Sequence, residues 1–332
     1  MTSTILDHAV FGVFSTHALH LADKYGVFVH LAADGPATPA RIAEARGIDQ
    51  DTLERLLLVL TAVSVVERDA DGAYRLASGT KDLLDPEHPR YIGDFVRHLV
   101  VNTTGQLERL DAYLAVGKAV ADRDRPAVFD SIYRDEVATG EFLEAMWNLS
   151  FGVSQELVRL AALDDARTLV DVGGASGAFA VAALSHYPRL SVTVFDLPQV
   201  GPFLDRTRRA EQLEDRLHFA PGDFFRDPLP EADCLSFGYI LSDWDDATCV
   251  ELLRKAHAAC APGGRVLLME RLFDEDGGPL PTAVMNLSMH VETEGRHRTA
   301  AEYTALLEAA GFADCTVHRS SWDKHLVVGR KP

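Results

Sequence analysis

The feature that most constrains this chain is an apolar run at residues 169–172 that leads directly into a glycine-rich turn, in the sequence LVDVGGASG. The run has the length of a buried strand. Gly173, Gly174 and Gly177 remove side chains that would hold a ligand away from the backbone. A strand, a turn of this kind and a following helix are typical of the first unit of an α/β nucleotide-binding domain.

Further short apolar runs follow this turn, separated by helical segments. They lie at 191–195, 217–219, 232–237 and 264–270. This alternation predicts βαβ units and a parallel sheet, because each parallel strand needs a crossover before the next one. The C-terminal half is therefore expected to be an α/β domain of Rossmann-like type.

Acidic residues stand at the ends of three of these predicted strands. Asp196 ends the second strand, where a carboxylate can accept hydrogen bonds from both ribose hydroxyls of a nucleotide. Asp223 and Phe224 follow the third strand and offer a carboxylate and an aromatic face to an adenine. Asp171, in the register DVGGASG, suits an amino acid's ammonium better than the diphosphate of a nicotinamide cofactor, which needs a GxGxxG cradle. These features favour an adenosyl amino acid over NAD.

The N-terminal part has a winged-helix pattern of three helical segments and a hairpin, at 4–29, 39–46, 51–65 and 65–76. Such a pattern can bind DNA. However, the third helical segment carries Asp51 and Glu54 against a lone Arg55, which is the wrong charge for phosphate. A dimerisation or scaffold role is expected instead of a transcription regulator.

The net charge of the chain also argues against binding to nucleic acid. The 332 residues include 50 acidic and 32 basic side chains, a formal net charge of -18, which repels phosphate backbones and anionic headgroups. No segment has the ~18 apolar residues of a membrane span. The four cysteines show no CxxC spacing. We therefore expect a cytoplasmic protein with no nucleic acid or membrane partner.

Six motifs carry a resemblance to a known family: DVGGASG, FDLP, GDFF, SDWDD, APGGRVLLME and EGRHRT. In this order and spacing they resemble the motifs of the plant-type O-methyltransferases, including members from bacterial secondary metabolism such as antibiotic biosynthesis. The resemblance covers essentially the whole chain. It implies S-adenosylmethionine (SAM) as methyl donor, a small-molecule substrate and a homodimer.

The resemblance also implies cofactor contacts for seven residues. Asp171 and Gly173 are expected at the methionine part of SAM, Asp196 at the ribose, and Asp223 with Phe224 at the adenine. Gly174 and Leu197, beside them in the chain, are the other two expected contacts. The expected organisation has three parts. Residues 1–100 form a winged-helix-like dimerisation domain, 101–160 a helical linker that lines the pocket, and 161–332 a Rossmann-like SAM-dependent methyltransferase domain.

The chain departs from the family at the group that accepts the proton. Where the family has HDWDD, with a histidine as base, this chain has Ser242, whose hydroxyl is too weakly basic at neutral pH. His297 replaces a glutamate that flanks that base in the family, and His290 stands where the family has an apolar pocket residue. Glu270 matches a second acidic flank and is a candidate for orienting a pocket group.

Our main interpretation assigns these changes to a metal. Asp243, His290 and His297 together would form a two-histidine, one-carboxylate set for a divalent ion such as Zn or Fe. An α-keto acid chelated by that ion would be stabilised as its enolate, and its β-carbon would accept the methyl group. The chain is in this respect similar to the bacterial α-keto acid C-methyltransferases.

Two alternatives stay open. In the first, the enzyme methylates a phenolic or otherwise hydroxylated small molecule on oxygen, or an amine on nitrogen, and His297 is the relocated base. In the second, the chain is a SAM-binding homologue whose chemistry has been altered or lost.

Overall fold

The computed structural model describes residues 3–88, 90–123 and 132–332, and the chain divides into two compact units between Glu108 and Arg109. The three-part division predicted from the sequence stays a prediction, and residues 124–131 of its pocket-lining segment lie outside the described residues.

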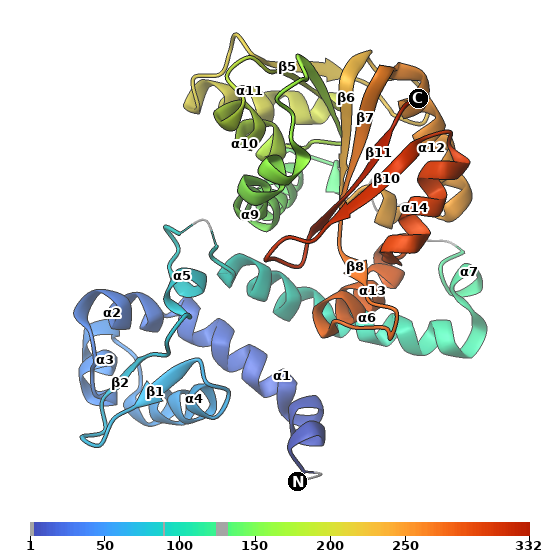
Figure 1. Ribbon diagram of the computed structural model, residues 1–332. Helices are drawn as coiled ribbons and strands as arrows, with labels where there is room; N and C mark the ends of the chain where they lie inside the picture. The colour runs from blue at the N-terminus through green and yellow to red at the C-terminus, as the bar shows by residue number, and fades with distance from the viewer. Residues whose placement is uncertain (1–2, 89, 124–131) are drawn as a thin grey trace. The chain divides into compact units, whose positions relative to one another are not determined.

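The first unit is helical with one short hairpin (Figure 1). Its elements are α1 (Ser3–Lys24), α2 (Val27–Asp34), α3 (Pro39–Arg46), α4 (Gln50–Ala62), β1 (Val66–Arg68), β2 (Tyr74–Leu76), α5 (Lys81–Leu84) and the first part of α6 (Gly93–Val116). The sequence predicted one helix over 4–29. Gly26 divides it into α1 and α2 because its backbone is left-handed, with φ 68°.

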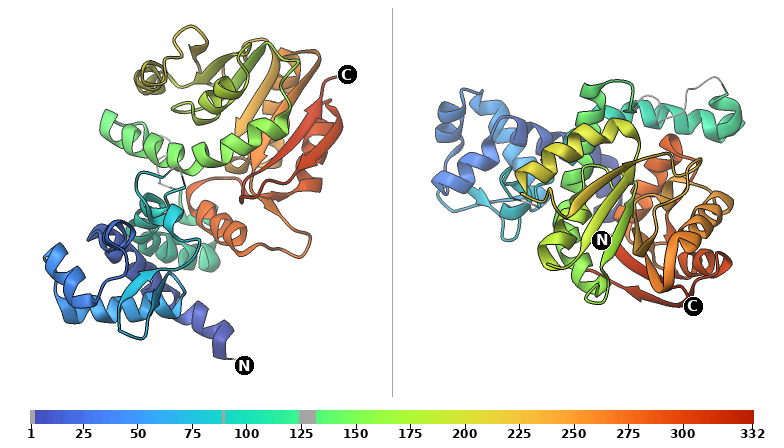
Figure 2. Two further views of the ribbon diagram at one scale, coloured as in Figure 1. Left: turned by 60° about the vertical axis from the view of Figure 1, so that its left-hand side comes forward. Right: turned by 90° about the horizontal axis from the view of Figure 1, so that it is seen from above.

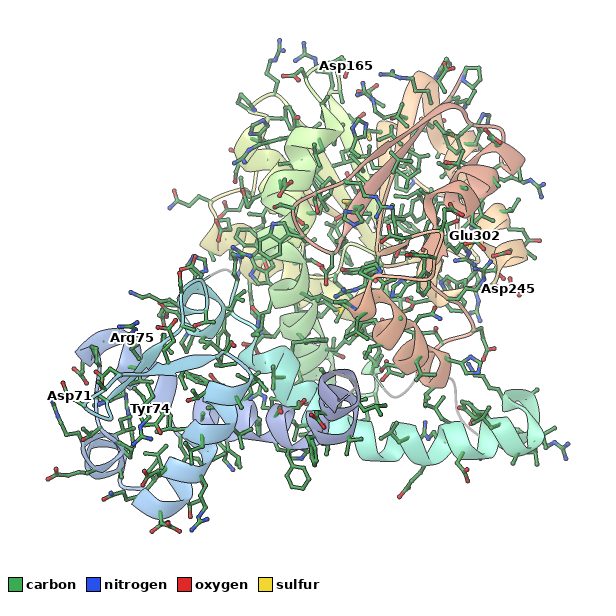
Figure 3. All side chains as sticks on the ribbon, turned by 60° about the horizontal axis from the view of Figure 1, so that its bottom comes forward. Asp71, Tyr74, Arg75, Asp165, Asp245 and Glu302 are labelled. Atoms are coloured by element: carbon green, nitrogen blue, oxygen red, sulfur yellow. The ribbon has the colours of Figure 1, made fainter. Side chains whose placement is uncertain are left out.

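Local sequence explains most of these boundaries. Pro39 begins α3, and Gly47 ends it with φ 65°. The side chain of Asp49 accepts the Thr52 N–H at 2.8 Å and so caps α4. Three of the five leucines of α4 (Leu53, Leu57 and Leu60) lie fully inside the core of this unit. Tyr74 of the hairpin, labelled in Figure 3, packs into the same core.

The second unit contains a seven-stranded sheet in the order β10-β11-β7-β6-β3-β4-β5. Its strands are β3 (Thr168–Val172), β4 (Ser191–Asp196), β5 (Leu217–Pro221), β6 (Ala232–Gly238), β7 (Cys260–Glu270), β10 (Ala313–His318) and β11 (His325–Arg330). The strands from β7 to β5 are parallel, and β10 and β11 form an antiparallel hairpin against β7. The prediction of a Rossmann-like α/β domain that follows a helical N-terminal domain in the chain is confirmed.

Helices cover both faces of this sheet, as Figure 1 and the two views of Figure 2 show. One face carries α9 (Glu136–Ala161), α10 (Ala178–His186) and α11 (Gly201–Ala210); the other carries α12 (Asp246–Ala259) and α14 (Ala300–Ala309). Strand residues alternate between the two layers. Leu169 packs in the α9 layer, whereas Val170 and Val172 pack in the α12 layer. Asp171, two residues after Leu169, therefore lies on the α9 face.

Short elements complete the unit around the carboxyl edge of the sheet. They are α7 (Lys118–Ala121), the 3₁₀ turns η1 (Pro198–Val200) and η2 (Leu241–Asp243), β8 (Leu272–Phe273), α13 (Leu280–Glu292) and β9 (Arg298–Thr299). Asp245 and Glu302, which belong to the first turns of α12 and α14, lie on one side of this unit in Figure 3, and Asp165, just before β3, lies far from them. Among the described residues no helix combines the length and apolar character needed to cross a membrane.

Candidate active site

The turn after β3 is held tightly around Asp171. Gly173 has φ +67°, and a Cβ there would lie 2.4 Å from Cδ1 of Ile240. A Cβ on Gly174 would lie 2.5 Å from Oδ2 of Asp171. Side chains at these two positions would collide with Ile240 and with the Asp171 carboxylate, so this turn requires glycine at both positions.

Asp171 is a buried acid, with only 2% of its surface exposed. Its Oδ1 accepts a hydrogen bond from Ser236 Oγ at 2.6 Å. Burial raises the pKa of Asp171 to about 6, although the Ser236 hydrogen bond and the charge of Lys324 oppose that rise. A ligand ammonium beside this carboxyl would favour its charged form.

Asp196, at the end of β4, is tied to the same turn. The Ala175 N–H donates to its Oδ2 at 2.8 Å, and the Leu197 N–H donates to its Oδ1 at 2.7 Å. Burial raises the pKa of Asp196 to about 6 against these two hydrogen bonds. The two acids expected at the methionine and ribose parts of SAM therefore lie on either side of one glycine turn.

The next strand end brings an aromatic wall to this turn. The Cβ position of Gly173 is 3.9 Å from Cε1 of Phe224. The Phe224 ring meets the ring of Trp244 edge-on at 6.4 Å, and Phe225 meets Trp244 at 4.7 Å. Asp223 caps the local turn by accepting the Phe225 N–H at 2.8 Å. The structure thus brings Phe224 to the glycine turn, and Asp223 is the residue immediately before it in the chain.

The SDWDD segment begins in η2 with Ser242 and Asp243, and Glu270 lies beneath this turn. Oε1 of Glu270 accepts the N–H groups of Leu241 at 3.0 Å and Ser242 at 3.3 Å. Its Oε2 and the hydroxyl of Ser242 are buried, and neither has a well-formed hydrogen bond within the described residues. Burial raises the pKa of Glu270, and the nearby Ser242 hydroxyl acts in the opposite direction.

The EGRHRT segment is pressed directly onto η2. A Cβ on Gly295 would lie 2.1 Å from the Ser242 carbonyl oxygen and 2.3 Å from the Trp244 nitrogen. The Arg298 guanidinium donates to the carbonyl oxygens of Leu241 at 2.9 Å and Trp244 at 2.8 Å. Two segments far apart in the chain are therefore locked together.

His297 lies inside this junction with 2% of its surface exposed. Its backbone N–H donates to Oδ1 of Asn286 at 2.8 Å, but in the described part of the chain neither ring nitrogen has a hydrogen-bond partner. Burial, followed by the positive charges of Arg271 and Arg298, lowers the pKa of His297 to about 4. The imidazole is therefore neutral at physiological pH.

The structure does not support the predicted metal set. His290 is an exposed residue of α13 whose ring packs edge-on against Tyr113 at 5.5 Å, whereas His297 is buried behind α13. Over the ranges 3–88, 90–123 and 132–332, no three His, Cys, Asp or Glu side chains are grouped to hold a metal ion. Asp243, His290 and His297 consequently do not act as one ligand set, and the predicted Zn or Fe site has no support.

Two residues of this region were not predicted from the sequence. Tyr133 is near Asp196 and Asp243, whose charges add to the effect of burial in raising the pKa of its hydroxyl. Lys324, before β11, is buried near Asp171 and Glu270. The one sequence signal for Lys324 is its place directly before the apolar residues of β11. No motif marks Tyr133.

Comparisons with known proteins agree with this architecture. Residues 113–313 match the O-methyltransferase domain and residues 8–85 match the O-methyltransferase dimerisation domain. Acetylserotonin O-methyltransferase of Bos taurus is 34% identical over 341 residues, covering 96% of this chain and 95% of that protein. The 3-hydroxy-5-methyl-1-naphthoate 3-O-methyltransferase of Streptomyces sahachiroi is 34% identical, with 94% and 90% covered.

The similarity extends to a solved structure with bound donor. The crystal structure of human N-acetylserotonin methyltransferase in complex with SAM has a TM-score of 0.86 and 30% identity, covering 100% of this chain and 98% of that one. Because these relatives are named as O-methyltransferases, C-methylation of an α-keto acid, our main interpretation of the sequence, is not supported. The chain belongs to the plant-type O-methyltransferase family and is a SAM-dependent methyltransferase.

Proposed function

We propose that this enzyme methylates a hydroxyl oxygen of a small phenolic or otherwise hydroxylated molecule, and that His297 is the base that accepts the hydroxyl proton. One observation carries the proposal. His297 is a buried, neutral imidazole whose two ring nitrogens find no partner in the described part of the chain. It lies on the segment that packs against Ser242, where the family has its base.

A ligand hydroxyl would complete the hydrogen bonding of this buried imidazole. A buried polar group without a hydrogen bond costs about 1–3 kcal/mol, so such a group is retained where a ligand completes it. An acceptor hydroxyl that donates to an imidazole nitrogen would remove that cost. The neutral ring has the lone pair that a base needs, and the serine at position 242 does not.

The charge balance of the reaction is simple. SAM supplies a methyl group on a positively charged sulfur. As the acceptor oxygen forms its bond to the methyl carbon, the bond from carbon to sulfur breaks, and the hydroxyl proton moves to an imidazole nitrogen. Before the hydroxyl proton is transferred, burial and the positive charges of Arg271 and Arg298 keep the His297 imidazole neutral and able to accept it.

Asp243 is proposed to bind the acceptor. Its carboxyl is enclosed by protein while part of its surface stays accessible, as expected of a side chain facing a cavity. Burial and the neighbouring charges of Glu270 and Glu292 raise the pKa of Asp243 well above its usual value. A protonated Asp243 can donate a hydrogen bond to a second oxygen of the acceptor, next to the reacting hydroxyl.

The donor end is assigned to the residues around the glycine turn. Asp171, Gly173 and Gly174 would hold the amino acid part of SAM, Asp196 and Leu197 the ribose, and Asp223 with Phe224 the adenine. The tight turn and the two buried acids support this assignment. Holding donor and acceptor at attack distance then supplies much of the rate enhancement.

The test compares His297→Gln with the wild type on a mixed panel of phenols, alcohols, amines and α-keto acids, with SAM carrying a labelled methyl group and mass spectrometry of the products. We expect the wild type to methylate hydroxyl oxygen and the variant to lose about 10²-fold or more in kcat. Its affinity for S-adenosylhomocysteine (SAH) should be unchanged. Ser242→Ala is the matched control and should keep most of the activity.

Three outcomes would overturn the proposal. They are labelled methyl on the carbon of a keto acid, full activity in His297→Gln, or SAH binding without methylation of any acceptor class. The last result would favour a SAM-binding homologue with altered chemistry.

A further inference from the structure

Lys324 is a lysine buried at the edge of the site, with 3% of its surface exposed. It stands immediately before β11, whose first residue, His325, pairs with Glu270 at the end of β7. Buried lysines are rare because the ammonium group loses its hydration, so one in a fold is normally matched to specific partners.

The path of this side chain depends on a glycine. Lys324 shares a sheet face with Leu326, which packs in the α9 layer, and its Nζ lies 3.4 Å from Ser150 Oγ on α9. A Cβ on Gly238, at the end of β6, would lie 3.3 Å from Nζ. Nζ also lies 3.9 Å from the ring centroid of Tyr239. The lysine thus extends from β11 across the end of β7 to β6, toward the strand that carries Asp171.

The charged groups around Nζ come from several elements. Glu270 of β7 and Asp171 of β3 face it, together with Arg271 and Asp323, which form an ion pair with each other. The charges of both Glu270 and Asp171 act on Lys324, so neither acid holds the lysine exclusively. Asp171 in turn faces Asp196, and Glu270 faces Arg298 and Asp243.

The electrostatic effects are mutual. Burial lowers the pKa of Lys324, and the charges of Glu270 and Asp171 oppose that decrease. Lys324 in turn acts to lower the pKa of both carboxyls, which burial raises. With Arg271 committed to Asp323, Lys324 is the cation shared by these two acids.

We propose that Lys324 is a positioning residue whose ammonium is shared by Asp171 and Glu270, and which thereby couples the donor end of the active site to the acceptor end. The inference rests on the proposed function in one respect, the assignment of Asp171 to the donor and Glu270 to the acceptor side. The lysine keeps the donor carboxylate charged before the ligand ammonium arrives, and Glu270 keeps the lysine charged. Removal of the charge of Glu270 or of Lys324 should therefore change the ionisation of Asp171.

The test measures SAH binding by calorimetry between pH 5.5 and 8.5, without an acceptor, so that it does not depend on the substrate. In the wild type the affinity should rise as Asp171 ionises. In Lys324→Met we expect the midpoint of this rise to move up by about one pH unit, because Asp171 has lost its nearby cation. Lys324→Arg should restore the wild-type midpoint, and exposed Lys81→Met is the surface control.

A double-mutant cycle with Glu270→Gln tests the coupling itself. The glutamine keeps the oxygen that accepts the Leu241 and Ser242 N–H groups but removes the charge that holds the proton on Lys324. We expect the SAH midpoint of Glu270→Gln to move up in the same direction, and the double variant with Lys324→Met to move no further than Lys324→Met alone.

Two results would overturn the proposal. A wild-type midpoint in Lys324→Met would show that the lysine does not act on Asp171. If the pH midpoint of SAH affinity is unchanged in Glu270→Gln, or if the shifts of the two single variants add in the double variant, Asp171 and Glu270 are not coupled through Lys324. Failure to methylate any hydroxyl would contradict the proposed function and leave these binding results to be judged separately.

Discussion

The guanidinium of Arg298 donates a hydrogen bond from Nη1 to the backbone carbonyl oxygen of Leu241, at 2.9 Å. Arg298 is completely buried and also donates to the Trp244 carbonyl oxygen at 2.8 Å and to Oδ1 of Asp246 at 2.8 Å. One side chain therefore satisfies both ends of η2, the turn that carries Ser242 and Asp243. The position of this turn therefore depends on Arg298.

Arg298→Lys should destabilise the protein and the turn together. A single ammonium cannot reach the two carbonyl groups and Asp246 at once, so at least one buried carbonyl loses its partner. We expect a loss of about 2–3 kcal/mol in the free energy of unfolding by urea. Arg296→Lys is the control, because Arg296 is 45% exposed and its partners are surface acids. Equal stability of the two variants would contradict the assigned role.

Gly295→Ala tests the contact between the two segments directly. The added methyl carbon would lie 2.1 Å from the Ser242 carbonyl oxygen, so either the turn or the EGRHRT segment must move. Because displacement of about 1 Å costs about 10²-fold in rate, kcat should fall by that order while SAH affinity persists. Gly105→Ala, whose Cβ would meet no atom within 4 Å, is the matched control and should behave as wild type in steady-state kinetics.

Asp171→Asn should weaken donor binding. The asparagine oxygen can still accept from Ser236, but the charge-assisted bond to the SAM ammonium is lost. A loss of about 1.5–3 kcal/mol corresponds to an SAH affinity roughly 10- to 100-fold weaker in calorimetry. Asp164→Asn, an exposed acid just before β3, should bind like the wild type. Unchanged SAH affinity in Asp171→Asn would remove this carboxylate from the donor site.

The exposed apolar side of α1 predicts a dimer contact. Val10, Phe11, Val13 and Phe14 are 62%, 56%, 59% and 70% exposed, an apolar surface that a soluble chain normally covers with a partner. This helix lies within the segment that matches the dimerisation domain. We expect light scattering after size-exclusion chromatography to find a wild-type dimer and a monomer for Phe11→Ser combined with Phe14→Ser. Leu58→Ser, on α4, should stay dimeric; a dimeric double variant would refute the contact.

Local patterns in the sequence predicted much of the fold. Each apolar run predicted as a parallel strand became one, from β3 to β7, because strand length, periodicity and flanking glycines are short-range properties. The strand ends then brought Asp171 and Asp196 to one turn, since parallel strands present their carboxyl ends at one edge. These parts of the site required no knowledge of long-range packing.

Sequence patterns failed where contacts between segments far apart in the chain determine the surroundings of a side chain. His290 and His297 are close in the sequence, yet α13 ends at Glu292 and the chain then turns inward along β9. One histidine therefore faces outward and the other lies inside. Lys324 was missed for the same reason, since its partners belong to β3, β6 and β7 and no local pattern links them. Spacing alone could not distinguish a ligand set from two unrelated histidines.

The buried imidazole also predicts how stability depends on pH. The pKa of His297 is about 4 in the folded protein against 6.5 for the free side chain. Between these values the unfolded chain binds a proton that the folded chain does not, so the contribution of this residue to stability is present above pH 6.5 and declines as the pH falls toward 4.

Urea unfolding of the wild type and His297→Gln at pH 7 and pH 5 measures this contribution. Relative to the variant, the wild type should lose about 2 kcal/mol on going from pH 7 to pH 5, because the other titrating groups are common to both proteins and cancel. The same comparison for exposed His186→Gln should show no such loss. Parallel pH profiles for the wild type and His297→Gln would mean that His297 is protonated as easily in the folded chain as in water. Its assignment as a buried neutral base would then be wrong.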